Sequence, residues 1–379
     1  MTEPPIPFNW PAPVGKELTY IQDVLEHGHL SGDGPYTQRC HALLQQLLGG
    51  SRVLLTTSCT HALEMAGLLL RIEAGDEVIL PSFTFVSTAN AFVLRGARPV
   101  FVDIRGDTLN LDERLLAGRI GPRTRAVVVV HYAGVGCEMD RILDVAGAAG
   151  IAVVEDNAHG LFGAYRGRPL GTFGSLSTLS FHETKNVFCG EGGAVVLNDP
   201  SLVDRAEIVR EKGTDRSRFF RGETDRYTWR DVGSSYLPGE ILAAFLLAQL
   251  EARAMIQERR QRLWERYREG LADWAEAGGV RLPVVPPHCT QPYHNFYLLL
   301  PSLAERQALV AHLRPYGIHA TFHYLPLHLS DMGTRFGGRR GDCPVTESVS
   351  DRLLRLPFFT TLGDERQDRV LAAVRAFKP

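Results

Sequence analysis

AVVVVHYAGVGCEMDRILDVAGAAGIAVVED, residues 126–156, contains two short apolar runs on either side of an amphipathic stretch. The runs Ala126–Val130 and Ile151–Val154 are almost wholly apolar, which is typical of short strands buried on both faces. Between them, Met139–Ala149 has the pattern of a helix. A strand, a helix and a second strand in this order favour an α/β fold with a parallel sheet.

The same alternation extends toward the N-terminus. Further strands are predicted at Arg52–Leu55, Glu77–Leu80 and Pro99–Val102, with helices at Thr60–Leu70 and Val86–Leu94 between them. We therefore predict one α/β domain with a mostly parallel sheet.

Beyond residue 160 the pattern changes. A hairpin is predicted over 163–171 with its turn at 166–167, followed by strands at 177–181 and 194–197 and a long helical stretch over 238–274. A strand at 295–300 with helices at 303–313 and 364–377 predicts a small α+β unit. With 379 residues, two domains are expected: a large one over 1–250, and a linking helix with a small domain over 251–379.

Composition narrows the function classes. The formal net charge of −2 and 22% charged residues give no global basic field of the kind that nucleic-acid binders carry. The N-terminus lacks a secretion signal, and no apolar run is long enough for a membrane span. None of the six cysteines forms a CxxC pair, so no metal site is indicated. We therefore expect a cytoplasmic protein.

Two charged residues lie where a ligand site is expected. Asp156 follows a buried strand, and the carboxyl ends of such strands bind ligands in α/β sheets. Lys185 follows another predicted strand and precedes the glycine-rich 190–193. Burial lowers the pKa of a lysine and makes its amine a better nucleophile. Each residue also has an ordinary explanation, a loop acid or a surface lysine.

Three weaker signals lie nearby. Thr57–Thr60 ends one strand and opens a helix, where free N–H groups and hydroxyls can bind an anion or simply cap the helix. Phe85 can stack on a flat ring or belong to the core. His159 can orient a phenolic oxygen or be an ordinary loop histidine.

Together these segments resemble one family. The order Ser58-Cys-Thr60, Phe85, Asp156 with His159, Ser180-Phe-His-Glu-Thr-Lys185-Asn and Gly190-Glu-Gly-Gly193 is similar to that of the DegT/DnrJ/EryC1/StrS sugar aminotransferases. This resemblance implies the aspartate aminotransferase-like fold (fold type I) and pyridoxal 5′-phosphate (PLP) as cofactor, with pyridoxamine phosphate formed in the half-reaction.

The resemblance also implies residue roles. Lys185 would form the Schiff base and shuttle protons, Asp156 would pair with the pyridine nitrogen, and His159 would hold the ring hydroxyl. Phe85 would stack on the ring. The phosphate would be held by residues at two strand ends, namely Ser58, Cys59, Thr60 and Ser180. Family members are dimers in which a partner's asparagine reaches the phosphate, and Ser235 stands at that position here.

Within the family, segments 81–96 and 219–236 are most similar to the transaminases that make dTDP-4-amino-4,6-dideoxy sugars from dTDP-4-keto-6-deoxy-glucose, with L-glutamate as amino donor. Val135 stands where many members have glutamine, which leaves the substrate details open. A 3-keto-sugar aminotransferase and a non-catalytic binding protein on the same fold are the alternatives.

Substrate residues are expected in two places. Arg230 and Lys212 belong to a basic stretch interleaved with aromatics, which can be a solvated loop or can reach the substrate diphosphate across a dimer interface. The other basic residues of this stretch are Arg216, Arg218 and Arg221. His323 and Tyr324 are candidates for the sugar ring.

Overall fold

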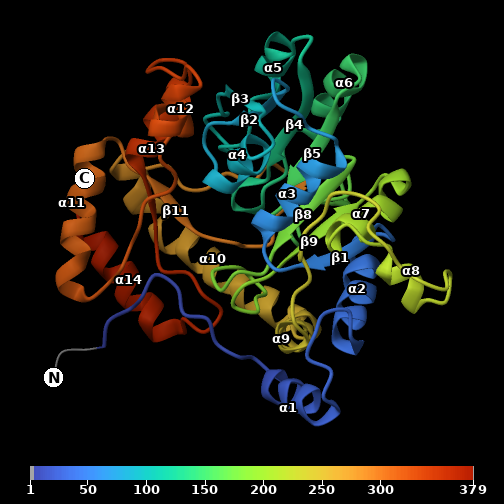
Figure 1. Ribbon diagram of the computed structural model, residues 1–379. Helices are drawn as coiled ribbons and strands as arrows, with labels where there is room; N and C mark the ends of the chain where they lie inside the picture. The colour runs from blue at the N-terminus through green and yellow to red at the C-terminus, as the bar shows by residue number, and fades with distance from the viewer. Residues whose placement is uncertain (1–3, 379) are drawn as a thin grey trace.

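The computed structural model describes residues 4–378, and its centre is a seven-stranded sheet (Figure 1). In sheet order the strands are β1 (Arg52–Thr56), β9 (Gly193–Leu197), β8 (Leu176–Ser180), β5 (Ala152–Asp156), β4 (Thr124–Val130), β2 (Glu77–Pro81) and β3 (Arg98–Val102). Of these seven, β9 runs antiparallel to both neighbours, and the four ladders from β8 to β3 are parallel. The predicted α/β fold with a mostly parallel sheet is confirmed.

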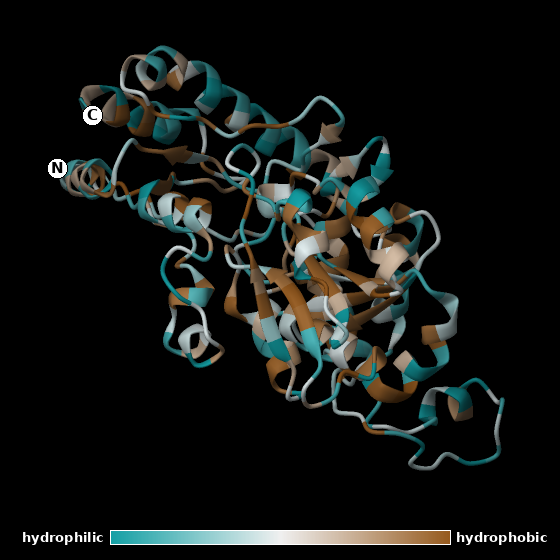
Figure 2. Ribbon diagram, turned by 90° about the horizontal axis from the view of Figure 1, so that it is seen from above, coloured by the Kyte–Doolittle hydropathy of each residue, from teal (hydrophilic) through white to brown (hydrophobic). Residues whose placement is uncertain are grey.

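Alternate residues of the central strands pack on opposite faces of the sheet. Val128 and Val154 belong to the core beneath one helical layer, whereas Val127 and Val153 belong to the core beneath the other. This two-sided burial explains why β4 and β5 are nearly continuous apolar runs. Figure 2 shows the strands as hydrophobic ribbons between more hydrophilic helices.

Two helical layers cover the sheet. The first layer contains α3 (Cys59–Leu69), α4 (Val86–Val93) and α7 (Val203–Arg210). The second contains α1 (Glu17–His27), α2 (Pro35–Leu47), α5 (Glu113–Leu116), α6 (Met139–Ala149) and α9 (Glu240–Glu251). The prediction for α6 matches its bounds, and those for α3 and α4 differ by one residue at the ends.

The predicted hairpin is present as β6 (Ala164–Tyr165) and β7 (Arg168–Pro169). Its turn residues Arg166 and Gly167 have φ values of 49° and 78°, the left-handed conformation that two-residue hairpin turns require. A third short strand, β10 (Cys289–Thr290), pairs with β6.

The C-terminal part has its own hydrophobic core, seen as the orange and red region of Figure 1. Here β11 (Tyr297–Leu299) pairs antiparallel with β12 (Leu353–Arg355). The surrounding helices are α10 (Arg253–Ala277), α11 (Leu303–Leu313), α12 (Asp331–Arg335), α13 (Pro344–Arg352) and α14 (Asp364–Ala376). The long helical stretch predicted over 238–274 is divided at Ala252 into α9 and α10.

The division of the chain at residue 250 stays a prediction. Helix α10 contributes Ile256 to the core of the sheet region and Leu263 to the C-terminal core, so it connects the two. Across residues 4–378, no helix combines the length and the apolarity that crossing a bilayer requires.

Candidate active site

A cavity of about 570 Å³ lies at the carboxyl ends of β5 and β8, between the sheet and the C-terminal part. It is lined by ten of the residues that the sequence singled out: Ser58, Cys59, Thr60, Phe85, Asp156, His159, Ser180, Lys185, His323 and Tyr324. Residues that are far apart in the sequence therefore meet in one place. The position at the strand ends agrees with the general rule for α/β sheets.

Lys185 projects into this cavity from the loop after β8. Its backbone N–H donates to the carbonyl of His182 at 2.9 Å, which fixes the turn that carries it. Desolvation lowers the pKa of the Lys185 amine, although Cys59 and Asp156 oppose this shift. Among residues 4–378, no group forms a hydrogen bond with its Nζ atom. The amine is therefore available to react with a carbonyl carbon.

Asp156 ends β5 and is only 5% exposed. Its Oδ2 atom accepts a 2.7 Å hydrogen bond from the Thr88 hydroxyl of α4, and its Oδ1 accepts from the Ala158 N–H at 3.3 Å. Desolvation raises the pKa of this carboxyl, and the hydrogen bond from Thr88 opposes the rise. No described cation lies within ion-pair distance of it. A buried carboxylate of this kind suits a protonated ring nitrogen.

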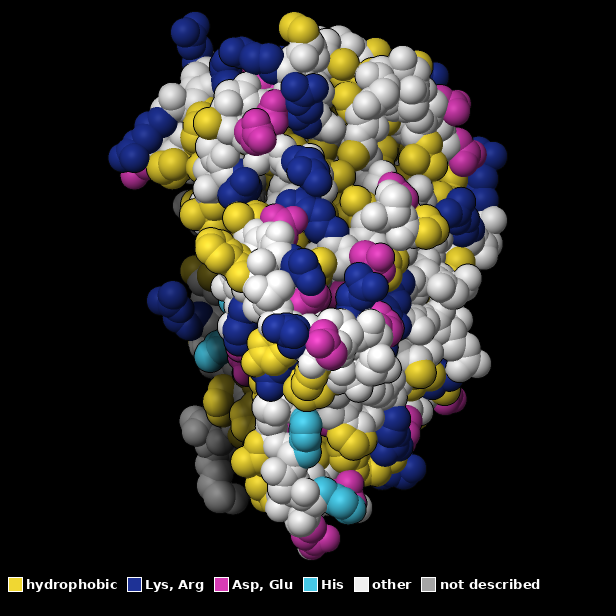
Figure 3. Space-filling model, turned by 45° about the vertical axis from the view of Figure 1, so that its right-hand side comes forward, with side chains coloured by type: hydrophobic (Ala, Val, Ile, Leu, Met, Phe, Trp, Pro, Cys, Tyr) yellow, Lys and Arg dark blue, Asp and Glu magenta, His cyan; other side chains and the backbone are white. Residues whose placement is uncertain are grey.

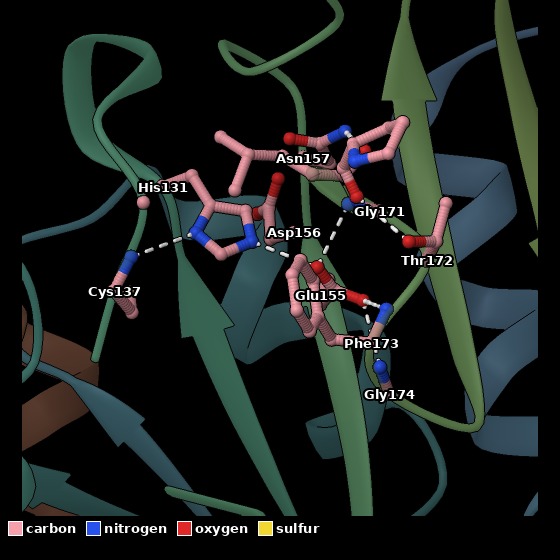
Figure 4. Close-up of polar contacts among 12 residues, drawn as sticks. His131, Cys137, Glu155, Asp156, Asn157, Gly171, Thr172, Phe173 and Gly174 are labelled. Carbon is pink, nitrogen blue, oxygen red and sulfur yellow. Dashed lines mark hydrogen bonds and ion pairs between the residues drawn. The ribbon is translucent and has the colours of Figure 1, made fainter. Parts of the chain in front are cut away.

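Glu155, the neighbour of Asp156, points to the opposite face of the sheet (Figure 4). Its carboxylate accepts hydrogen bonds from the N–H groups of Gly171, Phe173 and Gly174 at 2.6–2.8 Å and lies 2.9 Å from Nε2 of His131. The Nδ1 atom of His131 accepts from the Cys137 N–H, so Nε2 carries the proton and donates. Both side chains are fully buried. This network fixes the end of β5, and hence Asp156, from the opposite face of the sheet.

We expect Glu155→Gln to lower the free energy of unfolding by about 3 kcal/mol. The amide oxygen of glutamine cannot accept all four hydrogen bonds, and its NH₂ group would face other N–H donors. Chemical denaturation of the variant and of the wild type measures this difference. The exposed Glu276 on α10 provides the control, and Glu276→Gln should change stability by less than about 0.5 kcal/mol. Equal stability of Glu155→Gln and wild type would contradict the role of the network.

The N-terminus of α3 lies on the cavity wall, and Ser58 caps it by accepting a 3.1 Å hydrogen bond from the His61 N–H. Its first N–H groups have no acceptor within the helix, and the helix dipole adds a partial positive charge. Ser180 at the end of β8 lies opposite Gly193 of β9, and Gly193 packs directly on the backbone of Ser58 and Cys59. A Cβ atom on Gly193 would lie 2.3 Å from the Ser58 carbonyl carbon, so only glycine permits this approach. The arrangement suits a phosphate group.

Aromatic groups line the rest of the cavity. Phe85 is 56% exposed and offers a ring face, with the Tyr324 ring centroid 6.3 Å away. The His159 ring stacks on His294 at 4.1 Å, and its Nε2 lies 3.5 Å from the Tyr324 hydroxyl. Burial holds the pKa of His159 well below its usual range, and its Nδ1 is buried without a partner among the described residues. A neutral histidine with one free nitrogen can hold a ring hydroxyl.

Ser235, Lys212 and Arg230 do not reach this cavity within one chain. Lys212 and Ser235 line a separate hollow of about 660 Å³. The Lys212 ammonium lies 2.8 Å from Glu211, and Arg230 donates to Asp215 at 2.7 Å. Their predicted contacts with cofactor and substrate stay predictions that require a second chain.

The remaining arginines of this basic stretch lie on and around α8 (Arg216–Phe220). Figure 3 shows Lys and Arg side chains interspersed with acidic and hydrophobic ones on one face of the molecule. Arg221 pairs with Glu207 and Glu223, and Arg218 also pairs with Glu223. The two pairs with Glu223 are exposed and contribute only about 0–1 kcal/mol each.

Sequence reasoning missed four cavity or near-cavity residues: Thr88, His294, Asn295 and Arg355. Thr88 had no signal of its own, because its role is defined by its hydrogen bond to Asp156. His294 and Asn295 are polar residues at the start of the apolar run 296–300. Arg355 is a lone charge within the apolar run 353–359. An isolated polar residue in such a run was the available signal.

Comparisons with known proteins identify the family. The model of the DegT/DnrJ/EryC1/StrS aminotransferase family matches residues 13–375. The spore coat polysaccharide biosynthesis protein SpsC of Bacillus subtilis is 32% identical over 381 residues, covering 98% of this chain and 96% of SpsC.

Solved structures give the same result. The aminotransferase TlmJ from Streptoalloteichus hindustanus superposes with a TM-score of 0.90 at 32% identity, covering 98% of both chains. Spr1654 from Streptococcus pneumoniae, solved in its PLP form, has a TM-score of 0.89 at 26% identity, covering 99% of this chain and 98% of that one.

The cofactor of this family is PLP. The residues present fit it, because the cavity combines a reactive lysine, a buried carboxylate, a helix N-terminus and a free aromatic face. The chain therefore belongs to the DegT/DnrJ/EryC1/StrS aminotransferase family and is a PLP-dependent sugar aminotransferase of fold type I.

Proposed function

We propose that this enzyme transfers an amino group from L-glutamate to C4 of dTDP-4-keto-6-deoxy-glucose, giving a dTDP-4-amino-4,6-dideoxy sugar. The observation that carries the chemistry is the presence of Lys185 and Asp156 in one cavity. The choice of substrate is supported by the similarity of segments 81–96 and 219–236 to transaminases of that specificity.

Bound PLP supplies an aldehyde carbon that carries the amino group and a ring that accepts electrons from the reacting carbon. Lys185 holds the cofactor covalently between turnovers. Asp156 keeps the ring nitrogen protonated, His159 orients the ring hydroxyl, and Phe85 covers one face. Ser58, Thr60 and Ser180, with the first N–H groups of α3, bind the phosphate.

Lys185 acts as the base and the acid in both half-reactions. Its Nζ atom would take the proton from the α-carbon of glutamate in the first half-reaction, with the bound cofactor supplying the electron sink. In the second half-reaction the same atom would deliver a proton to C4 of the sugar. The lowered pKa of Lys185 favours the neutral amine that this role requires.

We further propose a homodimer in which the segment 211–235 of one subunit reaches the cavity of the other. Support comes from exposed aromatics on this segment, since Trp229 is 78% and Phe220 68% exposed. Large exposed apolar side chains close together mark protein interfaces. Ser235 would then donate to the cofactor phosphate, and Arg230 and Lys212 would face the substrate diphosphate.

We expect Arg230→Ala to raise KM for the nucleotide sugar about 10-fold or more, because a charged hydrogen bond contributes about 1.5–3 kcal/mol, while KM for glutamate stays unchanged. Steady-state kinetics with each substrate varied in turn measures both constants. Light scattering on the wild type should give twice the chain mass. Equal effects on the two KM values, or a monomeric mass, would contradict this assignment.

The central experiment is incubation of the purified yellow enzyme with glutamate and dTDP-4-keto-6-deoxy-glucose, followed by NMR of the product. An amino group at C4 is the expected result, and its configuration shows whether the product is a gluco or a galacto sugar. Turnover of a 3-keto isomer alone would favour a 3-aminotransferase. A colourless protein that binds no added PLP would favour a binding protein.

A further inference from the structure

His294 and His159 stack on each other in the wall of the active-site cavity. The two residues are only 7% and 6% exposed, their ring centroids lie 4.1 Å apart, and the ring planes differ by 18°. His159 follows β5 of the sheet region, whereas His294 belongs to the segment that leads into β11. The contact therefore joins the two parts of the fold, and the His159 ring cannot tilt toward His294 without a clash.

The orientation of the His294 ring is fixed by Asn186, the residue after Lys185. Asn186 donates through its Nδ2 atom to the Pro292 carbonyl at 2.6 Å and to the side-chain oxygen of Gln257 at 3.3 Å. Its Oδ1 atom therefore faces the Nδ1 atom of His294, 3.0 Å away, so this Nδ1 carries the proton and donates. Burial holds the pKa of His294 well below its usual range, so the ring is neutral.

The backbone that carries His294 is strained, and a buried arginine holds it. Tyr293 has a φ value of 54°, in the left-handed region that a bulky residue rarely adopts. Arg260 of α10 is 2% exposed and donates through Nε to the Tyr293 carbonyl at 2.9 Å and through Nη2 to the His294 carbonyl. Strained residues persist only where their surroundings fix them, and they are concentrated at functional sites. This segment therefore has the features of one that positions a functional group.

We propose that His294 is a positioning residue of the cofactor site, whose ring holds His159 in the orientation that meets the ring hydroxyl of PLP. This assignment rests on the contact proposed for His159. The Nδ1 atom of His159 is buried without a partner among the described residues, and its Nε2 has only the weak 3.5 Å contact with Tyr324. Stacking on His294 provides the restraint that these hydrogen bonds do not, because packed rings favour few relative orientations.

A double-mutant cycle between His294 and His159 tests this coupling. PLP is titrated into the full-length protein freed of cofactor, and quenching of tryptophan fluorescence gives the Kd. We expect His294→Ala to raise this Kd about 2- to 10-fold when His159 is present, the range for loss of one aromatic pair. In the His159→Ala background the same change should raise the Kd less than about 1.5-fold, because no ring remains to be positioned.

Absorbance of the holoenzyme provides a second readout, which does not depend on turnover. The visible band of bound PLP changes with pH, and the midpoint of this change responds to the group that contacts the ring hydroxyl. His294→Ala should therefore shift the midpoint in the same direction as His159→Ala does. A residue that only stabilises the fold would leave the midpoint unchanged.

His294→Phe separates the stacked ring from the hydrogen bond to Asn186. Phenylalanine keeps a flat ring beside His159 but leaves the Asn186 oxygen without its donor, so it should lower the thermal midpoint as His294→Ala does. Its Kd for PLP and its absorbance midpoint should nevertheless stay nearer to those of the wild type than the values of His294→Ala do.

The matched control is His312→Ala. His312 is partly buried in the C-terminal part, and its Nε2 atom lies 3.0 Å from the Ala373 carbonyl. Its ring packs beside Tyr316 and Phe377, at centroid distances of 5.4 and 5.5 Å. Because His312 does not line the cavity, this variant should lower the thermal midpoint and leave the Kd for PLP unchanged.

Three results would overturn the assignment: equal effects of His294→Ala with and without the His159 ring, an unchanged Kd in His294→Ala, or equal losses of PLP affinity in His294→Phe and His294→Ala. If His159→Ala itself left the Kd and the absorbance midpoint unchanged, the assignment would fail together with the contact proposed for His159. Because PLP binds before any substrate, failure of the wild type to aminate the keto sugar would contradict the proposed substrate alone.

Discussion

Replacement of Lys185 by alanine is expected to lower kcat by at least about 10⁴-fold, because one amine holds the cofactor and moves the proton in both half-reactions. No second described lysine lines the cavity to replace it. The variant should still bind PLP through Asp156 and the N-terminus of α3, but borohydride should no longer fix the cofactor to the chain. Mass spectrometry after reduction measures this attachment directly.

The control for this variant is Lys16→Ala. Lys16 is exposed, pairs with Glu251 and does not line the cavity, so its loss should leave kcat and cofactor attachment unchanged. Residual activity of Lys185→Ala above about 1% of wild type, or a reduced adduct on another residue, would contradict the assignment.

The second large effect is expected at Asp156. An asparagine there keeps the shape and can still interact with Thr88, but its neutral amide cannot stabilise a positive charge on the ring nitrogen. We expect kcat to fall about 10²- to 10³-fold, the range for loss of one preorganised electrostatic group. Single-turnover reaction with glutamate measures this step without the sugar.

Thr88→Val separates charge from position. This variant removes the 2.7 Å hydrogen bond to the Asp156 carboxylate and leaves the carboxylate itself, so we expect only about a 10-fold loss. If Asp156→Asn and Thr88→Val reduced the rate equally, the negative charge of Asp156 would not be the important factor.

The central strands were predicted well because burial on both faces requires a continuous apolar run within each strand. The runs in β4 and β5 are apolar whichever strand lies beside them. The order of the strands in the sheet left no such signal. Strand β9 lies between β1 and β8, and nothing in the sequence near Gly193 indicates that the strand beginning at Arg52 is its neighbour. Helices α1 and α2 were not predicted. In α2 the buried Tyr36, Cys40 and Leu44 recur every fourth residue, so a helical signal was present there and was missed.

The same distinction holds for the site. Lys185 and Asp156 were predictable because each is a charged residue at or shortly after the end of a buried strand. Thr88 and Arg355 were missed because what matters about them is which residues they meet, or fail to meet, in the folded chain. The pairing of β12 with β11 and Thr321 that brings Arg355 to the cavity joins segments that are separated by more than 30 residues.

The position of β9 in the sheet also affects how the chain folds while it is being synthesised. Gly193 of β9 packs against the backbone of Ser58 and Cys59 at the start of α3. The proposed phosphate site at this helix N-terminus therefore needs a strand that is synthesised long after the helix. At about 5–20 residues per second, the intervening chain of about 140 residues takes roughly 7–28 s to synthesise. During that interval the hydrophobic β1 lacks its ladder partner. Nascent chains shorter than about 200 residues should therefore depend on chaperones and bind no PLP.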